Sequence, residues 1–272
     1  MKKIILLICA TTLFVACSKS SSDDAPAVQP TTTAPFSGIL LKKITNTGYG
    51  GSTRANDFTY DGNKIVKVIQ QGGNEVRYSY SGNLISSKNN YSGGTLTEGT
   101  SFSYTADKLT GIVFSETVFA GTRFTRFELI HNTNSTSTSI TYKQFQSTNS
   151  GSESQVGSGT YTIANGNLVK DEYTYSGGVQ VITYAYDTKN SPVKSVLGCN
   201  KLVYDASLFS VNNLLSTTTV TNYTSGTAPS TEINSSTYVY NTNDYPLSSV
   251  TQRTSNGGSP IVVLGFSSVY TY

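Results

Sequence analysis

The chain has 272 residues, of which 13% are charged, and its formal net charge is +3 at pH 7. Loss of residues 1–16, which hold two of the lysines, would lower that charge to +1, so the protein has no broad positive field for nucleic acid. Tyr, Ser, Thr, Asn and Gly are abundant, which is typical of strands and turns and excludes a helical bundle.

Residues 1–16 have the features of a secretory signal peptide. Two lysines precede an apolar run, Ile4 to Val15, that is shorter than the roughly 20 residues of a membrane-spanning helix. The end of this segment, Phe14-Val15-Ala16-Cys17, resembles a bacterial lipobox. Phe14 occupies the position where leucine is usual, and the leucine, Leu13, lies one place earlier. That resemblance implies cleavage before Cys17 and a lipid anchor on Cys17. The alternative is an ordinary cleaved signal that happens to end in cysteine.

Residues 17–36 are predicted to form a disordered tether, because Ser, Thr, Ala and Pro leave almost nothing to bury. Ser22, Asp23 and Asp24 resemble the short acidic export signal of Bacteroidetes surface lipoproteins. This implies a lipid-anchored protein on the outer face of the outer membrane. The alternative is that the two aspartates only solvate a linker.

The three cysteines exclude a disulfide framework. Cys9 lies in the signal and Cys17 is the predicted lipid site, so Cys199 stands alone. Cys199 is expected to be a small buried apolar side chain rather than a nucleophile.

Pairs of aromatic or apolar residues two positions apart recur through residues 37–272, and in a strand such pairs share one face. Polar turns follow most pairs and an aliphatic residue follows each turn, as in Asp61-Gly62-Asn63 before Ile65, so each unit reads as a hairpin. The pairs are Phe58 and Tyr60, Tyr78 and Tyr80, Phe102 and Tyr104, Tyr161 and Ile163, Tyr173 and Tyr175, Tyr184 and Tyr186, Tyr238 and Tyr240, and Tyr270 and Tyr272.

The predicted fold is therefore all-β. It is an antiparallel meander of repeated β-hairpins, with about 10 to 14 strands, forming a large twisted or rolled-up sheet. The first strand is expected near Ile39 to Ile44. The turn chemistry does not distinguish an open sheet from a closed one.

The repeated phrase resembles a degenerate YD repeat, the unit of RHS-type shells, as found in Bacteroidetes surface lipoproteins of unknown function. The resemblance covers most of residues 58–272, and the Tyr-Asp itself is present at Tyr60-Asp61 and Tyr186-Asp187. It implies strand-and-turn architecture and no activity. A shell fragment of this type would enclose an internal cavity.

One interval, residues 187–215, interrupts the rhythm, and its Asn190-Ser191-Pro192 resembles an Asn-Pro insertion of similar lipoproteins. We expect a loop or short helical turn that plugs one face or end of the sheet. A ligand pocket in this segment is the alternative. The residues expected to be buried are Val196, Leu197, Leu202 and Leu208.

Catalytic motifs and metal motifs are missing from the sequence. The single histidine, His131, and one unmodified cysteine cannot supply a His-based triad or a zinc site, and no cofactor is indicated. A non-enzymatic protein is therefore predicted. The alternative is a surface glycan hydrolase whose carboxylates, for example Asp171, Asp187 and Asp205, converge in the fold.

The leading interpretation is a structural or binding module held at the membrane through Cys17, with a glycan or an envelope protein as its partner. Tyrosine can stack on sugars, but most of the tyrosines are expected to stabilise the sheet. The candidates for ligand stacking are Tyr78, Tyr80, Tyr173, Tyr175, Tyr184 and Tyr186.

Overall fold

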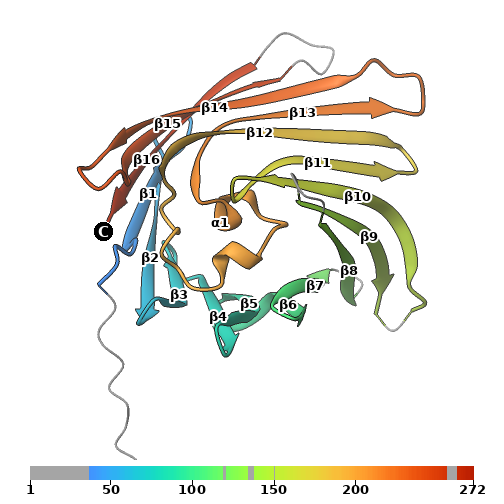
Figure 1. The fold of residues 1–272 in the computed structure, drawn as a ribbon, viewed down its shortest axis with the longest axis horizontal. Helices are drawn as coiled ribbons and strands as arrows, with labels where there is room; N and C mark the ends of the chain where they lie inside the picture. The colour runs from blue at the N-terminus through green and yellow to red at the C-terminus, as the bar shows by residue number, and fades with distance from the viewer. Residues whose placement is uncertain (1–36, 119–120, 134–137, 150, 256–261) are drawn as a thin grey trace, which may run out of the picture. The chain divides into compact units, whose positions relative to one another are not determined.

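Sixteen antiparallel strands make up almost all of the part of the chain that the structure, a computed structural model, describes, namely residues 37–118, 121–133, 138–149, 151–255 and 262–272 (Figure 1). The predicted signal peptide, Cys17, and the export signal Ser22, Asp23 and Asp24 lie outside these residues. The strands are β1 (Lys43–Thr47), β2 (Thr53–Asp61), β3 (Lys64–Gln70), β4 (Glu75–Ser81), β5 (Leu84–Ser92), β6 (Thr95–Thr105), β7 (Lys108–Val118), β8 (Gly121–Thr133), β9 (Thr138–Thr148), β10 (Ser154–Ala164), β11 (Asn167–Tyr175), β12 (Gly178–Asn190), β13 (Asn212–Tyr223), β14 (Ser230–Tyr240), β15 (Pro246–Ser255) and β16 (Val262–Thr271).

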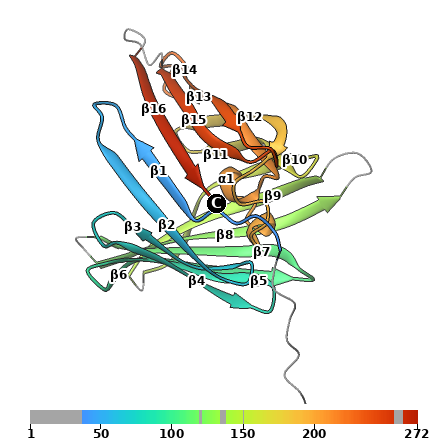
Figure 2. The same ribbon diagram turned by 90° about the vertical axis from the view of Figure 1, so that its left-hand side faces the viewer.

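The strands pair in chain order, and the last strand returns to the first to close a barrel. β1 pairs with β2 on one side and with β16 on the other, in a register that runs from Lys43 opposite Thr271 to Thr47 opposite Ser267. Both ribbon views show β16 beside β1 (Figures 1 and 2). The all-β antiparallel meander is confirmed, and the sheet rolls up until it closes, which leaves no free edge.

The expected 10 to 14 strands are too few, because strands without a Tyr-x-Tyr pair were hard to recognise. β8 and β9 carry scattered Phe and Thr instead of that pair, and β13 is rich in Thr. A strand with polar residues at inward positions as well, such as the buried Thr221 of β13, lacks the alternation signal on which strand prediction depends.

Side chains alternate between the inside and the outside of the barrel, with apolar residues inside. On β6, Phe102 is buried, whereas its neighbours Ser101 and Ser103 are exposed. The outer wall carries ion pairs, including Lys43 with Asp57 at 3.6 Å and Lys170 with Glu172 at 3.0 Å. The hydrophobic core therefore lies in the lumen of the barrel.

The recurring tyrosines hold neighbouring hairpins together through their hydroxyl groups. Four of these hydroxyls each donate to a backbone carbonyl about one hairpin earlier, at 2.7–3.0 Å. Several of these strands have a register shift at or beside the tyrosine, as between Ser103 and Tyr104, where the local ladder is interrupted. The donor and acceptor pairs are Tyr60 with Leu41, Tyr104 with Ile85, Tyr186 with Leu168, and Tyr238 with Leu214.

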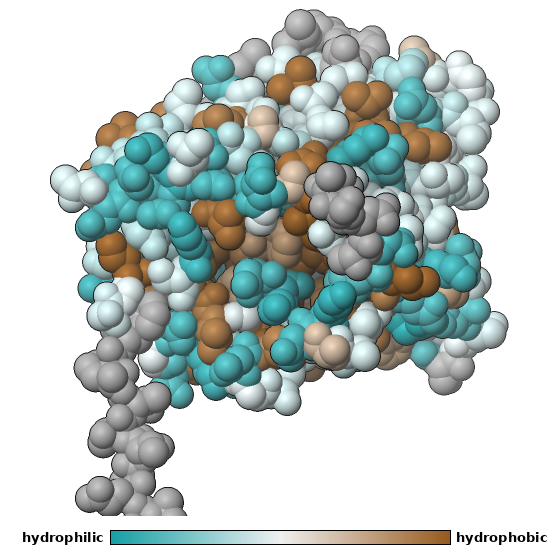
Figure 3. Space-filling model, viewed as in Figure 1, coloured by the Kyte–Doolittle hydropathy of each residue, from teal (hydrophilic) through white to brown (hydrophobic). Residues whose placement is uncertain are grey.

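Residues 191–211, here called the plug, leave the wall between β12 and β13 and fold into the lumen. They contain a 3-10 turn, η1 (Cys199–Lys201), and one short helix, α1 (Ala206–Phe209), which Figure 1 shows inside the ring of strands. On the face of the molecule seen in Figure 3, which has the same view as Figure 1, hydrophobic side chains lie recessed in the middle, with hydrophilic side chains around them.

Among the described residues, no helix has the length and apolar character needed to cross a bilayer.

The plug supplies much of the core. Val196 and Leu202, which were expected to be buried, are 4% and 0% exposed, while Leu197 and Leu208 are half-buried. Cys199 is also buried, and burial raises the pKa of its thiol to about 12, which keeps it protonated and unreactive. The plug residues in the core cluster are Val193, Val196, Cys199, Leu202 and Val203.

Polar contacts fix the plug to the wall. The Leu197 N–H donates to the Asn63 carbonyl at 2.9 Å, and the Tyr80 hydroxyl donates to the Leu197 carbonyl at 3.1 Å. The Asp205 carboxylate caps α1 by accepting from the backbone N–H of Ser207 at 3.0 Å. The plug is therefore a fixed part of the fold.

Candidate functional site

A polar cavity of about 680 Å³ opens at the end of the barrel opposite to the plug's point of entry. The plug leaves the wall where β12 ends, whereas the cavity lies where β1 and β3 end and where β2, β4 and β16 begin. We call it the mouth cavity. Its lining residues are Asn46, Thr47, Gly48, Ser52, Arg54, Asn56, Gln70, Gln71, Asn74, Phe266, Ser267 and Ser268.

Strand register brings the polar side chains of the cavity together. Arg54 on β2 is opposite Asn46 on β1, and Asn46 is opposite Ser268 on β16. Two positions further along β2, Asn56 is opposite Gln70 on β3. Directly opposed side chains in antiparallel strands have Cβ atoms about 5 Å apart, so these residues form one continuous inner surface.

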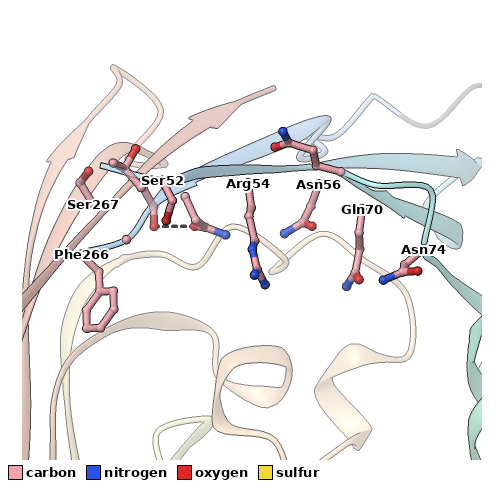
Figure 4. A pocket seen from close by; sticks show the side chains of 12 residues that line it. Ser52, Arg54, Asn56, Gln70, Asn74, Phe266 and Ser267 are labelled. Atoms are coloured by element: carbon pink, nitrogen blue, oxygen red, sulfur yellow. Dashed lines mark hydrogen bonds between the residues drawn. The ribbon is translucent and has the colours of Figure 1, made fainter. Parts of the chain in front are cut away.

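Figure 4 shows Arg54, Asn56, Gln70 and Asn74 pointing into the same space, with the ring of Phe266 on the same side of the wall. The Phe266 side chain is 38% exposed, so part of its ring is available to a ligand. The arrangement offers a guanidinium group, several amides and an apolar ring. It can hold a polar molecule by hydrogen bonds and stacking.

Some of the amides are already oriented by the protein. The Ser268 hydroxyl donates to Oδ1 of Asn46 at 2.8 Å, and the Ala55 N–H donates to Oε1 of Gln71 at 3.2 Å. Each of these bonds occupies the carbonyl oxygen of the amide and leaves its NH₂ group as a donor. Fixed donors lose less conformational entropy when a ligand binds.

A smaller cavity of about 350 Å³ lies at the same end of the barrel, between β6, β7 and β8. It contains carboxylates, but they already have partners: Glu116 pairs with Arg123, and Oε2 of Glu98 accepts from the Asn90 amide at 2.6 Å. The rings of Phe114 and Phe127 form its apolar part.

The tyrosines proposed for ligand stacking face the lumen. Tyr78, Tyr80 and Tyr184 pack against the core that the plug completes, and burial raises the pKa of each phenol. The Tyr186 hydroxyl accepts from Ser210 of the plug at 3.0 Å, and burial raises its pKa to about 12.

Tyr173 and Tyr175 lie at the end of β11 and stack on each other, with ring centroids 5.5 Å apart. The ring of Tyr173 also covers Gly157, where a Cβ atom would come within 2.4 Å of it. These contacts give the tyrosines a structural role in the barrel, and stacking of any of the six on a ligand stays a prediction.

The three carboxylates proposed for hydrolysis each serve the fold. Asp171 accepts from the Tyr142 hydroxyl at 2.9 Å, and burial raises the pKa of Asp171 to about 6. Asp187 accepts from the N–H of Asn213 at 3.0 Å and from the Tyr240 hydroxyl. With Asp205 capping α1, all three carboxylates are engaged in hydrogen bonds within the protein.

Within the described ranges, no group of three or more His, Cys, Asp and Glu residues is arranged to hold a metal. His131 lies on β8, with Nε2 at 2.6 Å from the Leu109 carbonyl oxygen. This contact ties β8 to β7.

The residues of the mouth cavity were not recognised from the sequence, although a signal was present. Arg54, Asn56, Phe58 and Tyr60 follow one another at every second position of β2 and therefore share one strand face. A face that changes from polar to apolar along one strand marks where an open lumen meets a packed core. Arg54 is thus placed inside the barrel by the same alternation that buries Tyr60.

No family model and no curated protein matches the chain. The solved structures that share its fold include two porin-like proteins. A porin-like protein from Bacteroides vulgatus ATCC 8482 has a TM-score of 0.54 and 14% identity, covering 86% of this chain and 99% of that one. A porin-like protein from Bacteroides uniformis ATCC 8492 has a TM-score of 0.52 and 11% identity, covering 85% and 97%.

These neighbours correct the predicted kinship with YD-repeat lipoproteins. The fold is a closed sixteen-strand barrel of the porin-like kind, and the RHS resemblance was wrong. Aromatic pairs followed by Gly and Asn turns indicate hairpins, which both architectures contain. The motif therefore identified the building unit and not the assembly.

Proposed function

We propose that the protein is a non-enzymatic binding protein of the bacterial outer membrane that holds a polar ligand in the mouth cavity. The observation that carries this proposal is the division of the lumen, which is packed by the plug at one end and open and polar at the other. A barrel divided in this way forms a receptacle for a ligand, whereas a channel needs a continuous path.

The likeness to two porin-like proteins supports an outer-membrane location. The outward-facing ion pairs favour a domain that lies beside the membrane, because a membrane-spanning barrel presents an apolar band to lipid. Lys67 with Glu75 and Arg126 with Glu128 are pairs of this kind, at 3.6 and 2.6 Å.

A lipid on Cys17 would hold such a domain at the membrane, and the lipobox-like residues before it support this attachment. Mass spectrometry of the mature amino terminus tests it, with acylated Cys17 as the expected result. Protease added to intact cells should cut the 17–36 tether if Ser22, Asp23 and Asp24 direct export to the surface. A full-length protein that survives the protease would contradict surface exposure.

Ligand capture tests the binding role. The full-length protein is presented to glycan arrays and to envelope extracts, together with an Asn56→Ala/Gln70→Ala variant. Loss of the captured ligand in this variant is expected. A Gln252→Ala variant, which changes an exposed amide on β15, is the matched control and should retain the ligand. Equal capture by all three proteins would place binding elsewhere, and steady ion conductance in planar bilayers would favour a channel.

A further inference from the structure

The charge among the residues that line the mouth cavity is positive and is not balanced by a carboxylate in the lining. From this we infer that the ligand is an acidic oligosaccharide whose carboxylate binds Arg54. This inference rests on the proposed function and specifies the ligand of the same cavity. Arg54 is the single charged side chain among the twelve lining residues, and no carboxylate of the described part of the chain lines the cavity.

Arg54 differs from the other arginines of the chain. The chain has five arginines, and each of the other four lies against a carboxylate within 2.7 Å or less. Within the described residues Arg54 has no such partner. A planar guanidinium group that points into a cavity matches a carboxylate with two parallel hydrogen bonds. The four paired arginines are Arg77, Arg123, Arg126 and Arg253.

The remaining groups of the cavity match a sugar. The NH₂ groups of Asn46 and Gln71 are donors whose amides are already oriented, and Asn56 and Gln70 lie beside them. Sugar hydroxyls accept and donate hydrogen bonds in such a setting. The partly exposed ring of Phe266 offers an apolar face on which the C–H face of a pyranose ring can stack.

The size and charge of the cavity disfavour other ligand classes. A volume of about 680 Å³ is within the usual range for small-molecule sites and suits a short oligosaccharide rather than a protein surface. A neutral sugar would remove water from Arg54 without supplying an opposite charge, and unpaired buried charges are unfavourable. An anionic sugar replaces that lost solvation.

Calorimetric titration of the full-length protein tests the inference. The probes are uronic-acid tetrasaccharides, each paired with its carboxyl-reduced, neutral counterpart. We expect the acidic member to bind at least 10-fold more tightly. Arg54→Gln should weaken that binding by about 10- to 100-fold, since hydrogen bonds to charged groups contribute about 1.5–3 kcal/mol. Arg54→Lys should recover part of it.

Arg77→Gln is the matched control, because Arg77 lies on β4, faces the outside of the barrel and pairs with Glu75 at 2.7 Å. It should leave the affinity unchanged. Equal affinity for acidic and neutral sugars, or unchanged acidic binding in Arg54→Gln, would overturn the inference. If Asn56→Ala/Gln70→Ala still weakens binding in that case, the mouth cavity keeps its proposed function. Binding of an acidic peptide with none of the sugars would also overturn the inference.

Discussion

The substitution Leu202→Ala should destabilise the protein strongly, because Leu202 lies in the plug at the centre of the barrel. Its side chain is 0% exposed and belongs to the core cluster with Val203 and Val196. Loss of a buried leucine side chain raises the free energy of the folded state by about 2–5 kcal/mol. A closed wall surrounds this site and limits its collapse, so the upper part of that range, about 4 kcal/mol, is expected.

The matched control is Leu215→Ala on β13. Leu215 is 36% exposed on the outer wall, so its loss should lower the free energy of unfolding by only about 1 kcal/mol. Urea unfolding followed by tyrosine fluorescence measures both variants, since the chain has 19 tyrosines and no tryptophan. Equal losses in the two variants would refute a plug that is packed into the lumen.

Two further substitutions test particular contacts. Burial raises the pKa of Asp171 to about 6 from its usual value near 4, so the folded protein binds the proton more tightly than the unfolded chain. Stability should therefore fall by up to about 3 kcal/mol as pH rises from 4 to 7, and urea titrations should show Asp171→Asn losing that fall while keeping an acceptor for Tyr142. An unchanged pH profile would contradict the burial of this carboxyl group. Gly198→Ala should destabilise by about 2 kcal/mol or more, because Gly198 has φ +81° and an added Cβ atom would lie 3.1 Å from neighbouring atoms. Gly226→Ala also has positive φ, at +77°, but meets nothing within 4 Å, so thermal unfolding should show a loss of only about 1 kcal/mol. Equal losses at the two glycines would mean that the plug does not press against the wall there.

Local patterns predicted the hairpins because alternation and turn chemistry act over a few residues. Tyr78 and Tyr80 share a strand face, and Gly82 has the positive φ that the following turn needs. The tyrosines were expected mainly to stabilise the sheet, and the hydroxyl of Tyr104, which bonds to the Ile85 carbonyl, shows how they do so.

Closure could not be predicted, because it depends on strands at opposite ends of the sequence. β1 is a five-residue strand whose sequence, KITNT, is largely polar, and its partner β16 lies more than 200 residues later. Their pairing follows from the tilt and stagger of all the strands between them. The mouth cavity shares this origin, since Arg54 on β2 and Phe266 on β16 line one cavity only because β1 pairs with β16.

The seam between β1 and β16 is therefore the most direct test of the structure that the proposed site requires. Thr45 and Val269 are opposite each other across it, and Val269 is exposed on the outer wall. Cysteines at these two positions, in a Cys199→Ala background, should form a disulfide within one chain on mild oxidation, seen as a mobility shift in a non-reducing gel. The control pair Thr45→Cys/Val113→Cys joins strands that are not neighbours and should not crosslink. Failure of the seam pair to crosslink within the chain, or equal crosslinking of both pairs, would contradict the closed barrel.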